Sequence, residues 1–183
     1  MSSLAWRVNP VTILSAAITI VGLFLPWWGV DITGGGINRI RLLWNVWNPP
    51  HFNGRVAGAT TLYWNFALSS VSVLVLALIA ASLVIVGSLT LIRKYLVAGL
   101  ILSGLSLVVY SAAVDYVTRN YCLTPLCVQG PIGIVSVPGV DATWGFQSGF
   151  YVTLLAILVL AAGLLLNSLL VRGKPTILSK TLP

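Results

Sequence analysis

The sequence predicts an all-α membrane protein, a bundle of four transmembrane helices with a small extracytoplasmic cap that contains β-strands. Four long stretches carry no charged side chain: Val8–Val30, Val56–Ile92, Tyr95–Val114 and Ala142–Val171. Crossing a bilayer takes roughly 20 apolar helical residues. Hydrophobic residues make up 58% of the 183-residue chain and charged residues only 7%, whereas soluble domains have about 25% charged residues.

A fifth uncharged stretch, Asn120–Val140, contains Pro125, Pro131 and Pro138, and these prolines prevent a continuous helix. We therefore expect one integral membrane domain, residues 1–183, with spans at about 10–28, 65–92, 95–114 and 149–171. Two outer loops, 29–64 and 116–148, join the first span to the second and the third to the fourth.

The first span is expected to begin at Pro10, because the first turn of a helix tolerates the missing N–H of proline. It is expected to end at Pro26-Trp27-Trp28, where the indoles suit headgroup depth. Arg7 and the apolar run after it also fit the start of a signal peptide. However, Leu25–Trp28 offers no small-residue cleavage site, so we interpret the run as a retained span.

Both outer loops contain extended segments. In the first loop, Trp28–Thr33 and Ile37–Trp47 flank a Gly34-Gly35-Gly36 turn, which is typical of paired strands. In the second loop, Ile132–Val137 is strand-like. The two loops together are therefore expected to build the cap.

The second span, Leu62 to Ile92, is longer than a bilayer requires, so it must tilt or project beyond the membrane. Arg93-Lys94 form a tight connection to the third span, and these two helices are expected to pack as an antiparallel hairpin. The third span is expected to end at Asp115, which caps the helix or pairs with Arg119 one turn further on.

The basic residues predict a multi-pass protein of the cell membrane with both termini in the cytoplasm, because cytoplasmic loops carry an excess of Lys and Arg. On the inner side would lie Arg7, Arg93, Lys94, Arg172, Lys174 and Lys180, and on the outer side Arg39, Arg41, Arg55 and Arg119. The net charge of +7 therefore falls mostly at span ends, where it meets lipid headgroups and gives little support to nucleic-acid binding.

Cys122 and Cys127 lie close together in the second loop, with Pro125 between them. Outside the cytoplasm a small disulfide ring is the natural interpretation; free thiols, or half of a tetrahedral metal site, are the alternatives. His51 is the single histidine, which excludes a haem held by two histidines and the three-histidine metal clusters of membrane oxidases. We expect no cofactor and no metal.

The span interiors contain no Asp, Glu, Lys, Arg or His, and proton relays and ion-coupled carriers depend on such residues. The sequence also shows no glycine-rich phosphate loop, no Ser/His/Asp set and no pair of neighbouring carboxylates. These observations disfavour an enzyme.

Small residues recur at helix-packing spacing, at Gly99 and Ser103 and at Ala77 and Ala81. Such pairs let helices approach closely. We interpret them first as packing within the bundle and second as a dimer face.

Trp44 and Trp47 lie well inside the first loop, where an ordinary interfacial belt of aromatic residues does not account for them. They either pack the loops into a compact cap or form a surface for a partner, together with the nearby His51 and Phe52.

The stretch Leu25-Pro26-Trp27-Trp28, followed by Leu43-Trp44-Asn45-Val46-Trp47, resembles the first loop of the claudin-like tetraspan proteins. In that family a strand leaves the first span at Leu-Pro-x-Trp, and a Gly-Leu-Trp follows. The family's paired cysteines lie in loop one, whereas both cysteines here lie in loop two. The resemblance implies an outer β-layer built from both loops and a role in lateral or cell-surface assembly.

The expected function is therefore non-catalytic: assembly or structural support of a membrane or cell-surface complex, with membrane lipid and other membrane subunits, or further copies of this chain, as partners. One alternative is an accessory subunit of a respiratory or redox complex that shapes a quinone or lipid pocket. Another is a small oligomeric channel lined by hydroxyl and amide side chains.

Overall fold

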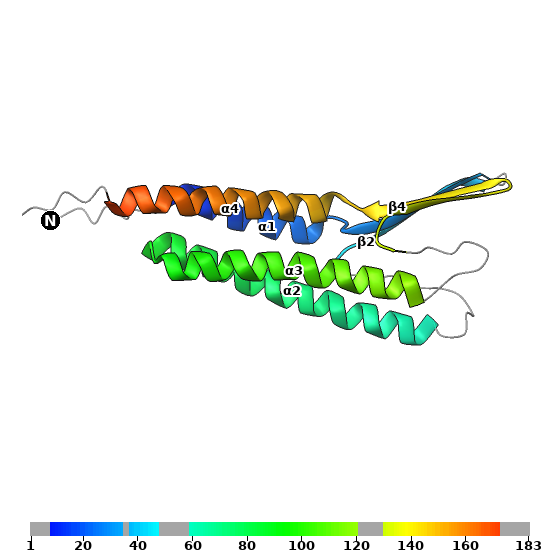
Figure 1. Cartoon of the computed structure of the whole chain (residues 1–183), viewed down its shortest axis with the longest axis horizontal. Helices are drawn as coiled ribbons and strands as arrows, with labels where there is room; N and C mark the ends of the chain where they lie inside the picture. The colour runs from blue at the N-terminus through cyan, green and yellow to red at the C-terminus, as the bar shows by residue number, and fades with distance from the viewer. Residues whose placement is uncertain (1–7, 35–36, 48–58, 121–129, 173–183) are drawn as a thin grey trace, which may run out of the picture.

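The computed structural model describes residues 8–34, 37–47, 59–120 and 130–172. It is mostly helical, with α1 (Pro10–Phe24), α2 (Ala59–Thr90), α3 (Arg93–Asn120) and α4 (Ser148–Arg172) lying side by side. A small antiparallel sheet extends beyond one end of the helices (Figure 1). α1 packs against α4 and α2, and α3 packs against α2 and α4.

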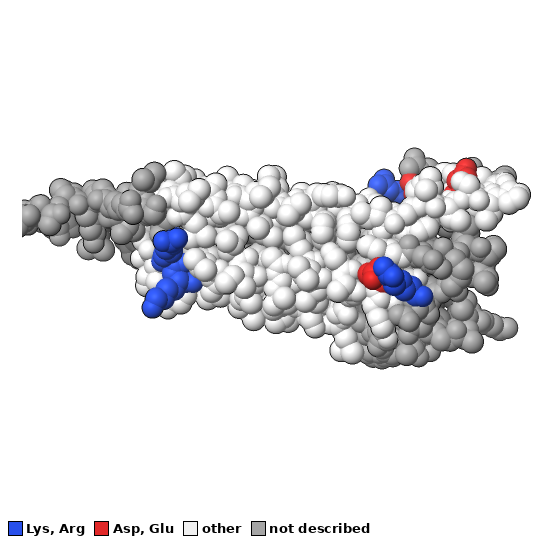
Figure 2. Space-filling view, viewed as in Figure 1, with Lys and Arg blue, Asp and Glu red and all other residues white. Residues whose placement is uncertain are grey.

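Three of these helices are long and apolar enough to cross a membrane: Leu68–Thr90, Arg93–Arg119 and Ser148–Leu166. α1 is also apolar but has only 15 residues. The charged side chains of the described residues gather at the two ends of an uncharged band (Figure 2). Within that band exposed Leu, Ile and Val side chains cover the outside, while several Ser and Thr side chains are buried inside. This distribution is that of a membrane protein, because lipid tails favour apolar side chains on the outside.

The sheet consists of β1 (Trp28–Gly34), β2 (Ile37–Trp44), β3 (Gly133–Val137) and β4 (Val140–Phe146), in the order β2-β1-β4-β3. The predicted extended segments of both loops are confirmed as β1, β2 and β3. The sequence analysis missed β4, although Val140, Ala142, Trp144 and Phe146 alternate with their neighbours as a strand requires. β4 pairs with β1 and thereby joins the two loops into one sheet.

The structure corrects three helix boundaries. α1 ends at Phe24 rather than at about residue 28, because Pro26 has no N–H to continue the helix and the Trp27 N–H donates to the Trp44 carbonyl oxygen at 2.8 Å. α3 does not end at Asp115. It continues to Asn120, since the Asp115 carboxylate accepts a hydrogen bond from Arg119 Nε at 2.8 Å, one turn further along the same helix. α2 begins at Ala59, earlier than the predicted residue 65.

The connection between α2 and α3 is two residues long, Leu91 and Ile92, and lies at the end of the helices opposite the sheet (Figure 1). Leu91 adopts a left-handed backbone conformation with φ of 57°, the usual conformation of the residue that follows a helix. The expected tight antiparallel hairpin is therefore present, but Leu91 and Ile92 form its turn instead of the predicted Arg93-Lys94, which lie in the first turn of α3.

Candidate functional site

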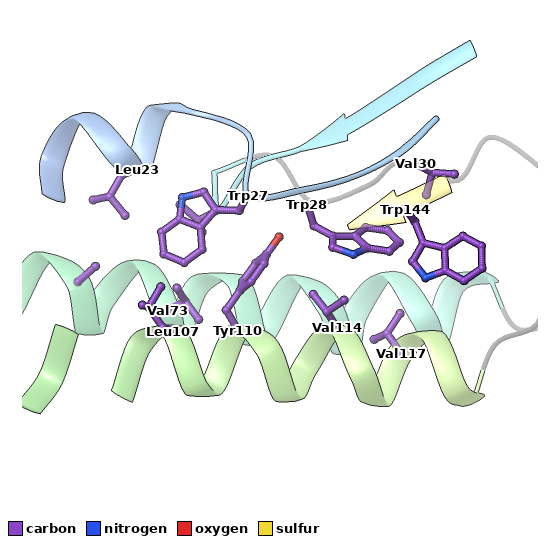
Figure 3. Packing of buried hydrophobic residues seen from close by; sticks show 12 residues of the cluster. Leu23, Trp27, Trp28, Val30, Val73, Leu107, Tyr110, Val114, Val117 and Trp144 are labelled. Atoms are coloured by element: carbon purple, nitrogen blue, oxygen red, sulfur yellow. The ribbon is translucent and has the colours of Figure 1, made fainter. Parts of the chain in front are cut away.

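Buried aromatic side chains hold the sheet on the helices (Figure 3). Trp27 is fully buried, and its ring lies edge-on to Tyr110 with ring centroids 5.0 Å apart. Trp27 Nε1 donates to the Gly22 carbonyl oxygen at 2.8 Å, which satisfies the polar end of the indole. Trp28 stacks on Trp44 of β2 with centroids 4.9 Å apart. The inner face of the sheet thus continues the hydrophobic core of the helices.

Two indoles fix the chain that enters β3. Trp28 Nε1 donates to the Pro131 carbonyl oxygen at 2.7 Å, and Trp144 Nε1 donates to the Gly130 carbonyl oxygen at 3.0 Å. Gly133 lies against the Trp144 ring so closely that an added Cβ would be 2.4 Å from ring atom Cζ2. The position of β3 relative to the helices therefore depends on these two tryptophans and on the absence of a side chain at Gly133.

The outward face of the sheet carries a polar row and, nearer the helices, a row with two glycines. In the polar row Asp31 lies opposite Arg41 on one side and Thr143 on the other. In the next row Gly29 pairs with Gly145, and a shallow depression of about 210 Å³ lies beside Gly145. It is lined by Val30, Asp31, Arg41, Leu43, Thr143, Trp144, Gly145 and Gln147.

The depression offers hydrogen-bonding groups of several kinds. Arg41 Nη2 donates to Gln147 Oε1 at 3.3 Å across its wall, and a carboxylate and a hydroxyl lie in the neighbouring row. In the described part of the chain no group of three or more His, Cys, Asp or Glu residues is placed to hold a metal ion. These groups make the depression polar.

The two edge strands of the sheet differ in charge. β2 carries Arg39 and Arg41, and charged side chains on an edge strand hinder pairing with other chains. β3 carries no charged residue, and Ile132 and Ile134 beside its edge are 62% and 71% exposed. An exposed, uncharged edge of this kind is a candidate surface for another protein.

The residues predicted to form a partner surface differ in their environments. Trp44 stacks on Trp28 and packs against the buried core. Trp47 is 48% exposed and stacks on Phe24 of α1, with centroids 5.6 Å apart. His51 and Phe52 lie outside the described residues.

The other predicted residues lie away from the sheet or outside the described part. Gly99, Ser103, Ala77 and Ala81 are all buried in the helices. An added Cβ at Gly99 would be 2.5 Å from Val84 Cγ2 of α2, so the two helices approach closely there. Arg172 is the last residue of α4. The remaining residues, Cys122, Cys127 and Lys174, lie outside the described ranges.

The sequence analysis did not single out Asn9, which joins three helices at the end opposite the sheet. Its side-chain oxygen accepts hydrogen bonds from the first turn of α1, and its Nδ2 donates to the Gly163 carbonyl oxygen of α4 at 3.0 Å. Its backbone N–H donates to the Ser88 carbonyl oxygen of α2, and Thr12 Oγ1 lies 2.6 Å from Ser88 Oγ. The signal was an asparagine directly before Pro10, a typical start of a helix.

A scan against protein-family models and a search of curated proteins both found no match to this chain.

Proposed function

We propose that this chain is a non-catalytic, four-span protein of the cell membrane whose sheet takes part in assembling a membrane or cell-surface complex. Both termini would lie in the cytoplasm with Arg93 and Lys94 at the start of α3, and the sheet would lie outside. The resemblance of Leu25–Trp47 to claudin-like proteins agrees with this role. Cys122 and Cys127 would form a disulfide bond that closes a small ring in the second loop.

The packing of α1 against α4 supports α1 as the fourth span. Asn9 contacts the Gly163 carbonyl at one end of α1, and beyond its other end the Gly149 N–H donates to the Pro26 carbonyl at 2.7 Å. Between these points Ser15 Oγ donates to the Ala156 carbonyl at 2.8 Å. α1 thus runs beside most of the 19-residue apolar segment of α4, Ser148–Leu166.

The β3 edge is the observation that carries the assembly role. Ile134 lies in the same row of the sheet as Asp31 and Thr143 and is 71% exposed, and Ile132 beside it is 62% exposed. Exposed apolar side chains at the level of the first charged residues gain from contact with another protein. A neighbouring subunit, either a further copy of this chain or another membrane protein, would cover them.

The test compares Ile134→Lys with Thr143→Lys in membranes solubilised with a gentle detergent. Both substitutions place a lysine in the same row on the outward face, but Thr143 is on an inner strand and Ile134 on the edge. Native mass spectrometry of the purified protein should show an oligomer or a bound partner that Ile134→Lys disperses and Thr143→Lys retains. A wild-type protein that is monomeric and without partners at all concentrations contradicts the proposal.

A further inference from the structure

α1 is too short to cross the hydrocarbon layer alone. Its 15 residues rise about 22 Å at 1.5 Å per residue, while the layer is about 30 Å thick. The chain then continues through Leu25 and Pro26 into β1 instead of extending the helix. If α1 is a span, this non-helical linker must supply the missing length.

Most backbone polar groups of the linker are hydrogen-bonded within the protein. The Leu25 N–H donates to the Gly22 carbonyl at 3.3 Å, and the Pro26 carbonyl accepts from Gly149. The Trp27 N–H donates to the Trp44 carbonyl at 2.8 Å, and its own carbonyl accepts from the Gln147 N–H at 2.9 Å. Non-helical backbone is tolerated at membrane depth only when neighbouring protein satisfies its polar groups in this way.

The first charged residues on two separate elements place the linker below the membrane surface. On α3, Asp115 lies five residues after Tyr110, the residue that packs on Trp27, which is about 8 Å along the helix. On β1, Asp31 lies four residues after Trp27, which is about 13 Å along a strand. Both distances put Trp27 below the first charges. On the face drawn in Figure 2, acidic side chains appear only at the sheet end of the uncharged band.

The surface at this depth is apolar and continues the lipid-facing side of α1. Leu14 and Val21 on that side are 54% and 56% exposed, and Phe24 at its end is 66% exposed. Trp47 stacks on Phe24 and, with Leu43 at 44% exposed, extends the apolar surface onto the end of β2 and the chain that follows it. Loop residues at the foot of a water-exposed sheet would not be expected to form such a surface.

We propose that the Leu25–Trp28 linker and the foot of the sheet lie inside the outer leaflet, where Phe24 and Trp47 contact lipid acyl chains. The inference rests on the proposed four-span arrangement. The occupant is lipid because the surface continues the apolar exterior that the helices present to the bilayer. The membrane boundary then passes at the level of Asp31, Arg41 and Asp115 rather than at the end of α1.

Tryptophan quenching in liposomes tests this inference on the full chain. The protein is reconstituted in phosphatidylcholine with or without bromine on the acyl chains, and emission is compared for wild type, Trp47→Phe and Trp44→Phe. Trp47 is half exposed, whereas Trp44 is stacked on Trp28. Trp47→Phe should therefore lose much of the bromolipid-quenchable emission, and Trp44→Phe should lose little.

A third variant separates failure of this inference from failure of the four-span proposal. Leu14→Trp in the Trp47→Phe background places an indole on the exposed side of α1. If bromolipid quenches this introduced indole but does not quench Trp47 in the wild type, and aqueous iodide quenches Trp47, α1 spans the membrane and the inference is overturned. If neither indole is quenched by bromolipid, the four-span proposal itself fails.

Discussion

Close packing of α2 against α3 at Gly99 predicts that an added methyl group there destabilises the protein. An alanine Cβ at this position would be 2.5 Å from Val84 Cγ2 and 3.1 Å from the Ala80 carbonyl oxygen. Carbon atoms pack best at about 3.5–4.0 Å, so the contact with Val84 is about 1 Å too short. The Ala80 oxygen belongs to the backbone and cannot rotate away, so α3 must shift outward.

Gly104 on the same helix is the matched control. An added Cβ there meets nothing within 4 Å, so Gly104→Ala should stabilise the helix by up to about 1 kcal/mol through propensity alone. Gly99→Ala has the same gain in propensity but also the cost of overpacking, about 1–3 kcal/mol. The two variants should therefore differ by about 1–3 kcal/mol in the free energy of unfolding, with Gly99→Ala the less stable.

Unfolding in mixed micelles at increasing mole fractions of SDS, followed by circular dichroism, measures this difference. Adding Val84→Ala to the wild type and to Gly99→Ala provides a second measurement. The loss of the Val84 methyl groups should cost less stability in Gly99→Ala than in wild type, because it also relieves the close contact between the alanine Cβ and Val84. Equal stabilities of Gly99→Ala and Gly104→Ala, with additive effects of Val84→Ala, would refute the close approach of α2 and α3.

Two further substitutions test the ends of the molecule. Asn9→Ser keeps a capping oxygen for the first turn of α1 but loses the hydrogen bond to Gly163, and Asn9→Ala loses both. A helix cap is worth about 1 kcal/mol, and an interhelical hydrogen bond in a membrane is worth about 0.6 kcal/mol. Asn9→Ala should therefore be less stable than Asn9→Ser in the same SDS titration. If Asn9→Ser were the less stable variant, the assigned hydrogen bonds of Asn9 would be contradicted. Gly133→Ala should push the Trp144 ring away and weaken its hydrogen bond to the Gly130 carbonyl, so limited proteolysis should cut near residue 130 faster than in wild type. Gly145→Ala serves as the control for a glycine within a strand, because its added Cβ would meet nothing closer than Ile132 Cγ2 at 3.8 Å. An unchanged cleavage rate in Gly133→Ala would contradict the anchoring of β3 by Trp144.

Local patterns predicted the helices and three strands, because charge-free runs and the Gly34–Gly36 turn act over neighbouring residues. The register that unites the two loops could not be predicted in this way. Trp28 pairs with Phe146, and no local signal links residues so far apart in the sequence. The shared inner face of β1 and β4 becomes evident only when Tyr110 and Val114 of α3 supply the surface that buries it.

The helix ends and the polar contacts required tertiary information as well. The third span was expected to end at Asp115 because a carboxylate is costly in lipid. Beyond the membrane, however, the ion pair of Asp115 with Arg119 is compatible with one more helical turn. Asn9 was given no role from the sequence, and only the placement of α2 and α4 reveals its bonds to Ser88 and Gly163. The partner residues Trp44 and Trp47 have opposite environments that their similar sequence positions do not distinguish.

The twist of the sheet limits how two copies of this chain could meet at β3. Adjacent strands rotate by about 20–25°, so a continuous hydrogen-bonded sheet through two four-stranded copies would turn one bundle by about 80–100° relative to the other. Bundles in one membrane must share the direction of the membrane normal. Association within a membrane therefore depends on side-chain contact by Ile132 and Ile134 more than on backbone pairing. On this basis Ile134→Val should retain the oligomer that Ile134→Lys disperses. Native mass spectrometry of the two variants would show whether apolar side-chain contact at the β3 edge holds the copies together.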